Sequence, residues 1–319
     1  MAEERKLARR RSGLGCMFCC CGIPSRSMRS CPSWTAAACR LLHRRRVDMR
    51  PSESGKRVDL YGASYRNFAT DLYADIRREA FGEDIGQTGW LAAEEQDLFL
   101  EWLHLSRSSQ LLDLACGSGR PTLRIAQKTG CHVSGVDLHT EAVASAKASA
   151  RELGYEGRTK FYQGNAAERL SFANASFDAI TCIDAINHLP DRPHVLEEWR
   201  RVLKPGGCLL FTDPIMLTGP MTNAEITIRA SIGLFVFVPA GYDEKLLKQA
   251  GFEVERVEDR TQNMAVNAAG WLEARAKRET DLRKIEGDEV FFGQQRFLET
   301  AAILARERRL SRFAIVARK

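Results

Sequence analysis

Two acidic residues and two glycines stand at positions where they could hold a small ligand. Asp113 lies in the apolar run that leads into Gly117 and Gly119, and Asp137 ends the next apolar run. Glycine lets a ligand approach the backbone and adopts positive φ at little cost. A carboxylate beside such a turn attracts an ammonium group, and one that ends the second strand suits ribose hydroxyls. The pattern therefore predicts a nucleoside-containing ligand at this turn.

The same residues argue against a ligand with a pyrophosphate. A dinucleotide fingerprint has glycine or alanine as its third small residue, where this chain has Thr122. Asp113 would repel a phosphate group. S-adenosylmethionine carries an ammonium, a ribose and an adenine but no phosphate, so it is the favoured cofactor and NAD the least favoured. The core sequence offers no clustered ligand set that would require a metal.

Alternating strands and helices are expected to position these residues. Such alternation is typical of an α/β fold with a parallel sheet, which binds ligands beyond the carboxyl ends of its strands. The expected strands are 110–116, 132–138, 160–164, 177–183, 208–213, 252–259 and 313–317. The expected helices are 58–81, 92–105, 121–128, 141–153, 194–203 and 243–250, and the long helical stretch before the last strand, about 262–310, is expected to form a cap over the active face.

Five motifs in this region resemble those of class I S-adenosylmethionine-dependent methyltransferases with a type 11 methyltransferase domain. They run, in the same order and spacing, as LLDLACGSGR, GVDL, GNA, FDAITCIDAINHLPD and LKPGG, between residues 109 and 213. The resemblance implies a Rossmann-like, doubly wound, seven-stranded sheet whose last strand is antiparallel. It also implies a methyltransferase, nearest to small-molecule enzymes such as phosphoethanolamine or sarcosine/dimethylglycine N-methyltransferases.

The resemblance implies a set of cofactor-binding residues. Asp113 and the 115–119 turn would hold the methionine end, Asp137 the ribose, and Asn165 the adenine side. Many members have Asp at that last position, but an amide oxygen can also accept from the adenine amino group. Ala115 replaces the first glycine of the family, which is acceptable if φ is negative there. The full set is Asp113, Ala115, Gly117, Gly119, Asp137, Leu138, Asn165, Ala166, Cys182 and Asp184.

His188 is the predicted catalytic residue, because the resemblance pairs the matching histidine with an N-terminal tyrosine. Tyr65 is the candidate tyrosine, with Tyr61 and Tyr73 as alternatives. Methyl transfer from a sulfonium depends mainly on positioning, and a base is needed only where the acceptor carries a proton. Histidine titrates near neutrality and could serve as that base. In the alternative interpretation, His188 only caps the strand end or faces solvent.

Other residues could line the acceptor site or could be structural. They are Asp213 at a strand end, Arg229 and Trp271 in the expected cap, and the apolar segment 232–241. We expect a small-molecule acceptor, possibly an amine. RNA or protein methylation and cofactor binding without catalysis are the alternatives.

Charge and cysteine content divide the chain into a tail and a body. Residues 1–47 hold 11 Lys and Arg against 2 acids, whereas the remainder holds 36 against 39. A mildly acidic body gives no support for a nucleic-acid groove. Six of the ten cysteines lie in the tail, and the other four lie in apolar runs typical of buried thiols in a reducing cytoplasm.

The expected organisation is a basic, Cys-rich, disordered tail (1–48), an N-terminal helical lid (49–108) and a methyltransferase domain (109–319). A zinc site or acylation in the tail is a weaker alternative, and Met49 is a possible natural start. No apolar run approaches the roughly 20 residues that a membrane-spanning helix needs. The sequence does not indicate an oligomeric state.

Overall fold

The computed structural model describes residues 67, 68 and 70–319. The chain divides into units 1–55 and 56–319, and every described residue belongs to the second. The interpretations of the tail, and the candidate tyrosines Tyr61 and Tyr65, lie outside the described residues.

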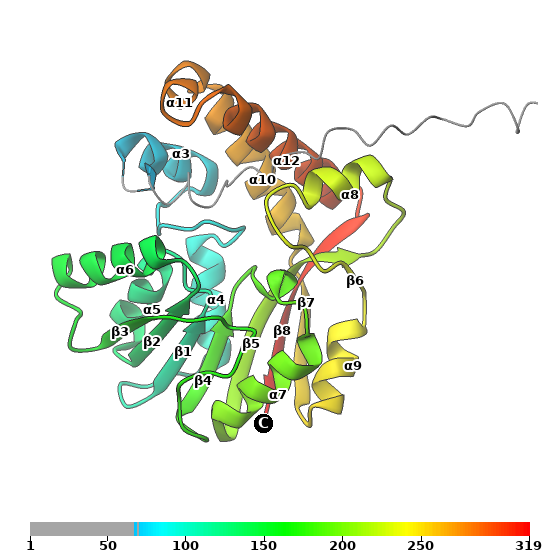
Figure 1. Ribbon diagram of the computed structural model, residues 1–319. Coiled ribbons are helices and arrows are strands. Elements are labelled where there is room, and N and C mark those ends of the chain that lie inside the picture. Colours follow the sequence, from blue (N-terminus) through cyan, green and yellow to red (C-terminus); the bar gives the residue numbers. More distant parts are fainter. Residues whose placement is uncertain (1–66, 69) are drawn as a thin grey trace, which may run out of the picture. The chain divides into compact units, whose positions relative to one another are not determined.

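The described residues form one mixed sheet in the order β3-β2-β1-β4-β5-β8-β7, with β6 paired to β5 (Figure 1). Strands β1 to β5 run parallel, and β8 is antiparallel to both of its neighbours. The predicted α/β fold with an antiparallel last strand is confirmed. Short β6 adds an eighth strand that the sequence did not suggest, and β5 is longer than expected. The strands are β1 Gln110–Leu114, β2 His132–Asp137, β3 Thr159–Gln163, β4 Phe177–Cys182, β5 Leu203–Leu217, β6 Val238–Pro239, β7 Glu253–Asp259 and β8 Leu310–Arg318.

Alternation along the strands gives the sheet two apolar faces, each covered by helices. Leu112 and Leu114 belong to the core that contains Trp199, whereas Leu111 belongs to the opposite core with Phe99. Successive side chains of a strand point to opposite faces, so both faces bury apolar surface. The first core is covered by α7 Arg192–Val202 and α9 Tyr242–Gln249, the second by α4 Ala93–Leu103 and α5 Arg120–Thr129; α6 Thr140–Glu152 packs on β2 and β3.

The cap helices lie beyond one end of the strands, with α3 beside them (Figure 1). Tyr73 and Ile76 of α3 share a core with Ala274 and Leu282 of the cap. The Tyr73 hydroxyl donates to Glu286 Oε2 at 2.5 Å, and burial followed by this carboxylate raises the pKa of the phenol above its usual value. These contacts join α3 to the cap. The elements are α3 Asp71–Phe81, the cap helices α10 Thr261–Ala276, α11 Glu279–Glu286 and α12 Asp288–Arg306, and the separate short helix α8 Asn223–Arg229.

Two further findings concern the described residues alone. None of their helices is both long and apolar enough to cross a membrane. The four cysteines among them, Cys116, Cys131, Cys182 and Cys208, are buried free thiols, as their apolar surroundings in the sequence predicted.

Candidate functional site

The turn between β1 and α5 has a backbone that only glycine adopts easily. Gly119 is the N-cap of α5 with φ 75°, and a Cβ there would lie 2.5 Å from the Cβ of Ala146. Pro121 occupies the first turn of α5, where its missing N–H needs no partner. The turn therefore brings backbone close to the carboxyl end of β1, where the sequence predicted the cofactor.

Asp113 and Asp137 are both buried beside this turn. Asp113 accepts from the hydroxyls of Thr122 at 2.5 Å and Thr181 at 2.7 Å, yet burial raises its pKa to about 6. Asp137 Oδ2 accepts the N–H of Gly117 at 2.8 Å. The second acid thus fixes the glycine turn, a structural role that the sequence did not suggest.

A cavity of about 60 Å³, here called the cofactor cavity, opens beside Asp113. One wall is the turn after β1, and another is the segment 87–89 that precedes α4. Asp184, which follows β4, closes the side away from the turn. The residues that line it are Gln87, Thr88, Gly89, Leu91, Gln96, Asp113, Ala115, Cys116, Pro121, Ile125, Ile183 and Asp184.

Ala115 has φ 56°, so the condition under which alanine would be unstrained at this position is not met. Residues with a side chain are strained in this left-handed region by about 1–2 kcal/mol, whereas glycine is not. We expect Ala115→Gly to raise the free energy of unfolding by about 1 kcal/mol, because the strain disappears. Chemical denaturation would measure the free energy of unfolding. Ala142→Gly in α6 is the control, and it should lower this free energy. An unchanged or lowered stability for Ala115→Gly would contradict the strain.

Four other residues of the predicted cofactor set do not line the cofactor cavity. Asn165 donates from Nδ2 to Glu168 and accepts the N–H of Ala167, so its side chain stabilises its own turn. Ala166 is buried, Leu138 is 58% exposed, and Cys182 is fully buried in the core. Their contacts with the cofactor stay predictions.

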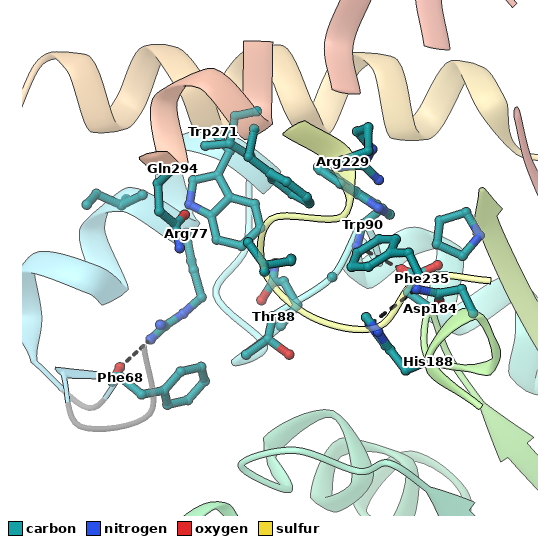
Figure 2. Close-up of a pocket in the computed structure, with 18 of the residues that line it drawn as sticks. Phe68, Arg77, Thr88, Trp90, Asp184, His188, Arg229, Phe235, Trp271 and Gln294 are labelled. Atoms are coloured by element: carbon teal, nitrogen blue, oxygen red, sulfur yellow. Dashed lines mark hydrogen bonds between the residues drawn. The ribbon is translucent and has the colours of Figure 1, made fainter. Parts of the chain in front are cut away.

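A second cavity of about 90 Å³, here called the acceptor cavity, has several Phe, Tyr and Trp rings in its wall (Figure 2). Trp90 stacks on Phe297 with ring centroids 6.4 Å apart, and the Arg229 guanidinium lies 4.2 Å from the Phe297 centroid. Trp271 reaches in from the cap and Phe235 from the 232–241 segment. Arg229 and Trp271 therefore line the cavity, as the sequence suggested, although Arg229 belongs to α8 and not to the cap. The other lining residues are Phe68, Tyr73, Ile76, Arg77, Gln87, Thr88, Gly89, Asp184, Asn187, His188, Pro214, Ile232, Gln294 and Leu298.

The two cavities share one wall. Gln87, Thr88, Gly89 and Asp184 line both of them. In the sequence, residues 87–89 had no predicted role beyond their place in the expected lid, 49–108. The two cavities are therefore adjacent, one at the place expected for the methyl donor and the other available to an acceptor.

His188 lies in the acceptor cavity, at the end of the short 3-10 helix Ile186–His188. Its Nδ1 donates to the carbonyl of Leu234 at 2.7 Å, so Nδ1 carries the hydrogen, and the Nε2 lone pair accepts from Nδ2 of Asn187 at 3.2 Å. Burial lowers the pKa of His188 below its usual value, and the nearby charge of Arg229 adds to the effect. At neutral pH the ring is therefore neutral, the form that a general base requires.

Asp213 does not line either cavity, which corrects its placement from the sequence. It is fully buried and binds Arg192 Nη1 at 2.6 Å, as does Asp243. Burial, followed by the neighbouring Asp213 charge, raises the pKa of Asp243 to about 7. Arg192 also donates to the carbonyl of Val236, so the cluster fixes the segment that carries Phe235.

Comparison with known proteins identifies the family to which the chain belongs. Residues 105–232 match the family described as "Methyltransferase domain". The chain is 30% identical over 204 residues to 27-O-demethylrifamycin SV methyltransferase of Amycolatopsis mediterranei, covering 60% of this chain and 75% of that protein. It is 31% identical over 221 residues to sterol 24-C-methyltransferase ERG6B of Gibberella zeae, covering 64% of this chain and 57% of that one.

A solved structure shows the same fold. Haemonchus contortus phosphoethanolamine N-methyltransferase 2, in complex with phosphomonomethylethanolamine and S-adenosylhomocysteine, superposes with a TM-score of 0.66 at 20% identity, over 82% of this chain and 61% of that one. The chain belongs to the S-adenosylmethionine-dependent methyltransferases. The family and cofactor predicted from the motifs are confirmed.

The residues beside the turn fit this cofactor. The buried carboxylate of Asp113 suits its ammonium group, and Asp137 suits the ribose hydroxyls. The bound cofactor supplies an electrophilic methyl group on a sulfonium. The chain itself has to position an acceptor, exclude water and, for an acceptor that carries a proton, remove that proton.

Proposed function

We propose that this methyltransferase acts on a small, mostly apolar acceptor enclosed between the carboxyl ends of the strands, α3 and the cap. The observation that supports this most is the aromatic cavity that shares the 87–89 wall with the cofactor cavity. Apolar walls with a few polar groups are typical of small-molecule sites. An N-terminal lid (49–108) and the cap would close over both ligands.

The acceptor atom in this proposal is a nitrogen or oxygen that carries a proton. His188 lies in the cavity wall as a neutral imidazole and would remove that proton, with Tyr65 as its proposed partner. An amine is one such acceptor. The names of the two relatives specify an oxygen and a carbon, so membership of the family does not choose the atom. We place the enzyme in the cytoplasm and propose no nucleic-acid substrate.

An acceptor screen tests the proposal. The protein would be incubated with S-adenosylmethionine and, separately, small amines, phenols, carboxylic acids, total RNA and a histone mixture, and S-adenosylhomocysteine formation measured. We expect turnover with small apolar acceptors only. Trp271→Ala, which widens the acceptor cavity, should shift the preference toward larger members of the same class. Turnover with RNA or histones alone, or none with any acceptor, would contradict the proposal.

A further inference from the structure

Arg312 is a charged residue buried near the start of β8, which lies between β5 and β7 in the sheet. It lies in β8 with 0% exposure, and its Nη1 is 2.8 Å from both carboxylate oxygens of Glu95. Its Nε is 2.7 Å from Asp184 Oδ1. Arg260 also binds Glu95, at 2.8 Å, so two arginines balance two acids. Burial alone would lower the pKa of Arg312, but the two carboxylates hold it above its usual value.

Buried ion networks contribute little net stability, because desolvation offsets the attraction between the charges. A role in holding backbone segments together explains the network better than a contribution to stability. Its ions come from α4, the end of β4, the start of α10 and β8. The network therefore fixes one end of the sheet against the helices that surround the two cavities.

Asp184 is the member of the network that reaches the site. Its φ is 54°, an unfavourable angle for a residue with a side chain. The Thr212 hydroxyl donates to Asp184 Oδ1 at 2.7 Å, and the Trp90 N–H donates to Oδ2 at 2.8 Å. With the two bonds from Arg312, these contacts determine the orientation of the carboxylate.

The Asp184 carboxylate in turn supports the wall between the cavities. A Cβ at Gly89 would lie 2.8 Å from Asp184 Oδ2, so the glycine backbone rests directly on the carboxylate. Figure 2 shows Asp184 joined to the Trp90 backbone at the edge of the acceptor cavity. Arg312 itself lines neither cavity.

We infer that Arg312 is a positioning residue that, through Asp184, holds the segment Gln87–Trp90 as the wall shared by the cofactor and acceptor cavities. A strand from the far end of the chain thus shapes the cofactor cavity without touching it. The inference depends on the cofactor of the family and not on the identity of the acceptor. It therefore survives if the proposed acceptor class is wrong.

Arg312→Lys tests the inference, because lysine keeps the charge but cannot bind two carboxylates with one planar group. We expect binding of S-adenosylhomocysteine, measured by calorimetry, to weaken about tenfold, as for loss of a charge-assisted hydrogen bond. Hydrogen exchange should speed up in residues 85–91 but not in α12. The matched control is Arg275→Lys, which alters an equally buried arginine bound to Glu286 in the cap. It should lower the melting temperature and leave the affinity within twofold.

Thr212→Val provides a milder test that leaves Arg312 unchanged. It removes the two hydrogen bonds between the Thr212 hydroxyl and Asp184, one donated to Oδ1 and one accepted from the Asp184 N–H. It should weaken S-adenosylhomocysteine binding roughly threefold to fivefold, with faster exchange in the same segment. If Arg312→Lys does not fold, Thr212→Val alone tests whether the contacts of Asp184 hold the segment Gln87–Trp90. Affinity within twofold of the parent, or weakened binding with unchanged exchange in residues 85–91, would overturn the inference.

Discussion

Replacing Asp113 with asparagine is expected to weaken binding of S-adenosylhomocysteine by about tenfold to a hundredfold. A hydrogen bond to a charged group contributes roughly 1.5–3 kcal/mol, and asparagine removes the charge while keeping the size. The hydroxyls of Thr122 and Thr181 hold the Asp113 side chain, so an asparagine of the same shape should occupy the same position. Titration calorimetry at pH 7 measures the effect.

The same carboxylate predicts how the affinity depends on pH. Burial raises the pKa of Asp113 to about 6, so below this pH the unliganded protein must lose a proton to bind an ammonium. The affinity of the parent should therefore rise roughly tenfold from pH 5 to pH 7 and then level off. Asp113→Asn should remove this dependence. A parent with constant affinity from pH 5 to 7 would contradict the role of Asp113.

Asp178→Asn is the control for both measurements. Asp178 lies at the amino-terminal end of β4, away from the carboxyl ends of the strands, where it accepts from Gln110 N–H and binds Lys204. Its replacement removes a carboxylate of the same kind but leaves the cofactor cavity intact. The affinity of this variant should stay within twofold of the parent and keep its pH dependence.

Replacing His188 with alanine is expected to slow methyl transfer by at least tenfold, and by about a hundredfold or more if proton removal limits the rate. The Leu234 carbonyl holds the neutral imidazole, and Nε2 would act as the base once an acceptor replaces its hydrogen bond from Asn187. Because His188 does not line the cofactor cavity, affinity for S-adenosylhomocysteine should be unchanged. Single-turnover rates with the acceptor found in the screen would measure the loss.

His194→Ala is the matched control, since this histidine is exposed on α7, six residues further along the chain. Its turnover should equal that of the parent. The rate of the parent should also fall as the pH drops through the lowered pKa of His188, and this fall should vanish in His188→Ala. Equal rates of methyl transfer for His188→Ala and the parent would contradict the role of His188 as the base.

Local patterns predicted the parts of the site that lie on consecutive strands. Asp113, the glycine turn and Asp137 follow from alternation and turn chemistry, because β1 and β2 are neighbours both in sequence and in the sheet. The sign of φ at Ala115 was left open by the sequence, and the angle is positive. Alanine favours negative φ by itself, and only the packed turn forces it into the left-handed region.

Residues that act across long separations in sequence gave weaker signals. Asp184 and Arg312 are 128 residues apart, and no local pattern pairs them. A signal did exist, because Arg312 directly precedes the apolar strand run 313–317, where an unpaired charge would be costly. Its carboxylate partners could be found only once the order of the strands placed β8 beside β5.

The place of β8 between β5 and β7 also has a consequence for synthesis. A ribosome delivers Asp113, Asp137, Glu95 and Asp184 long before it delivers Arg312. Until then, a nascent chain would have to bury two acids of the network without the guanidinium that neutralises both. Competence to capture the nucleoside is therefore expected only after β8 has been made and has inserted between β5 and β7, which precede it in the chain.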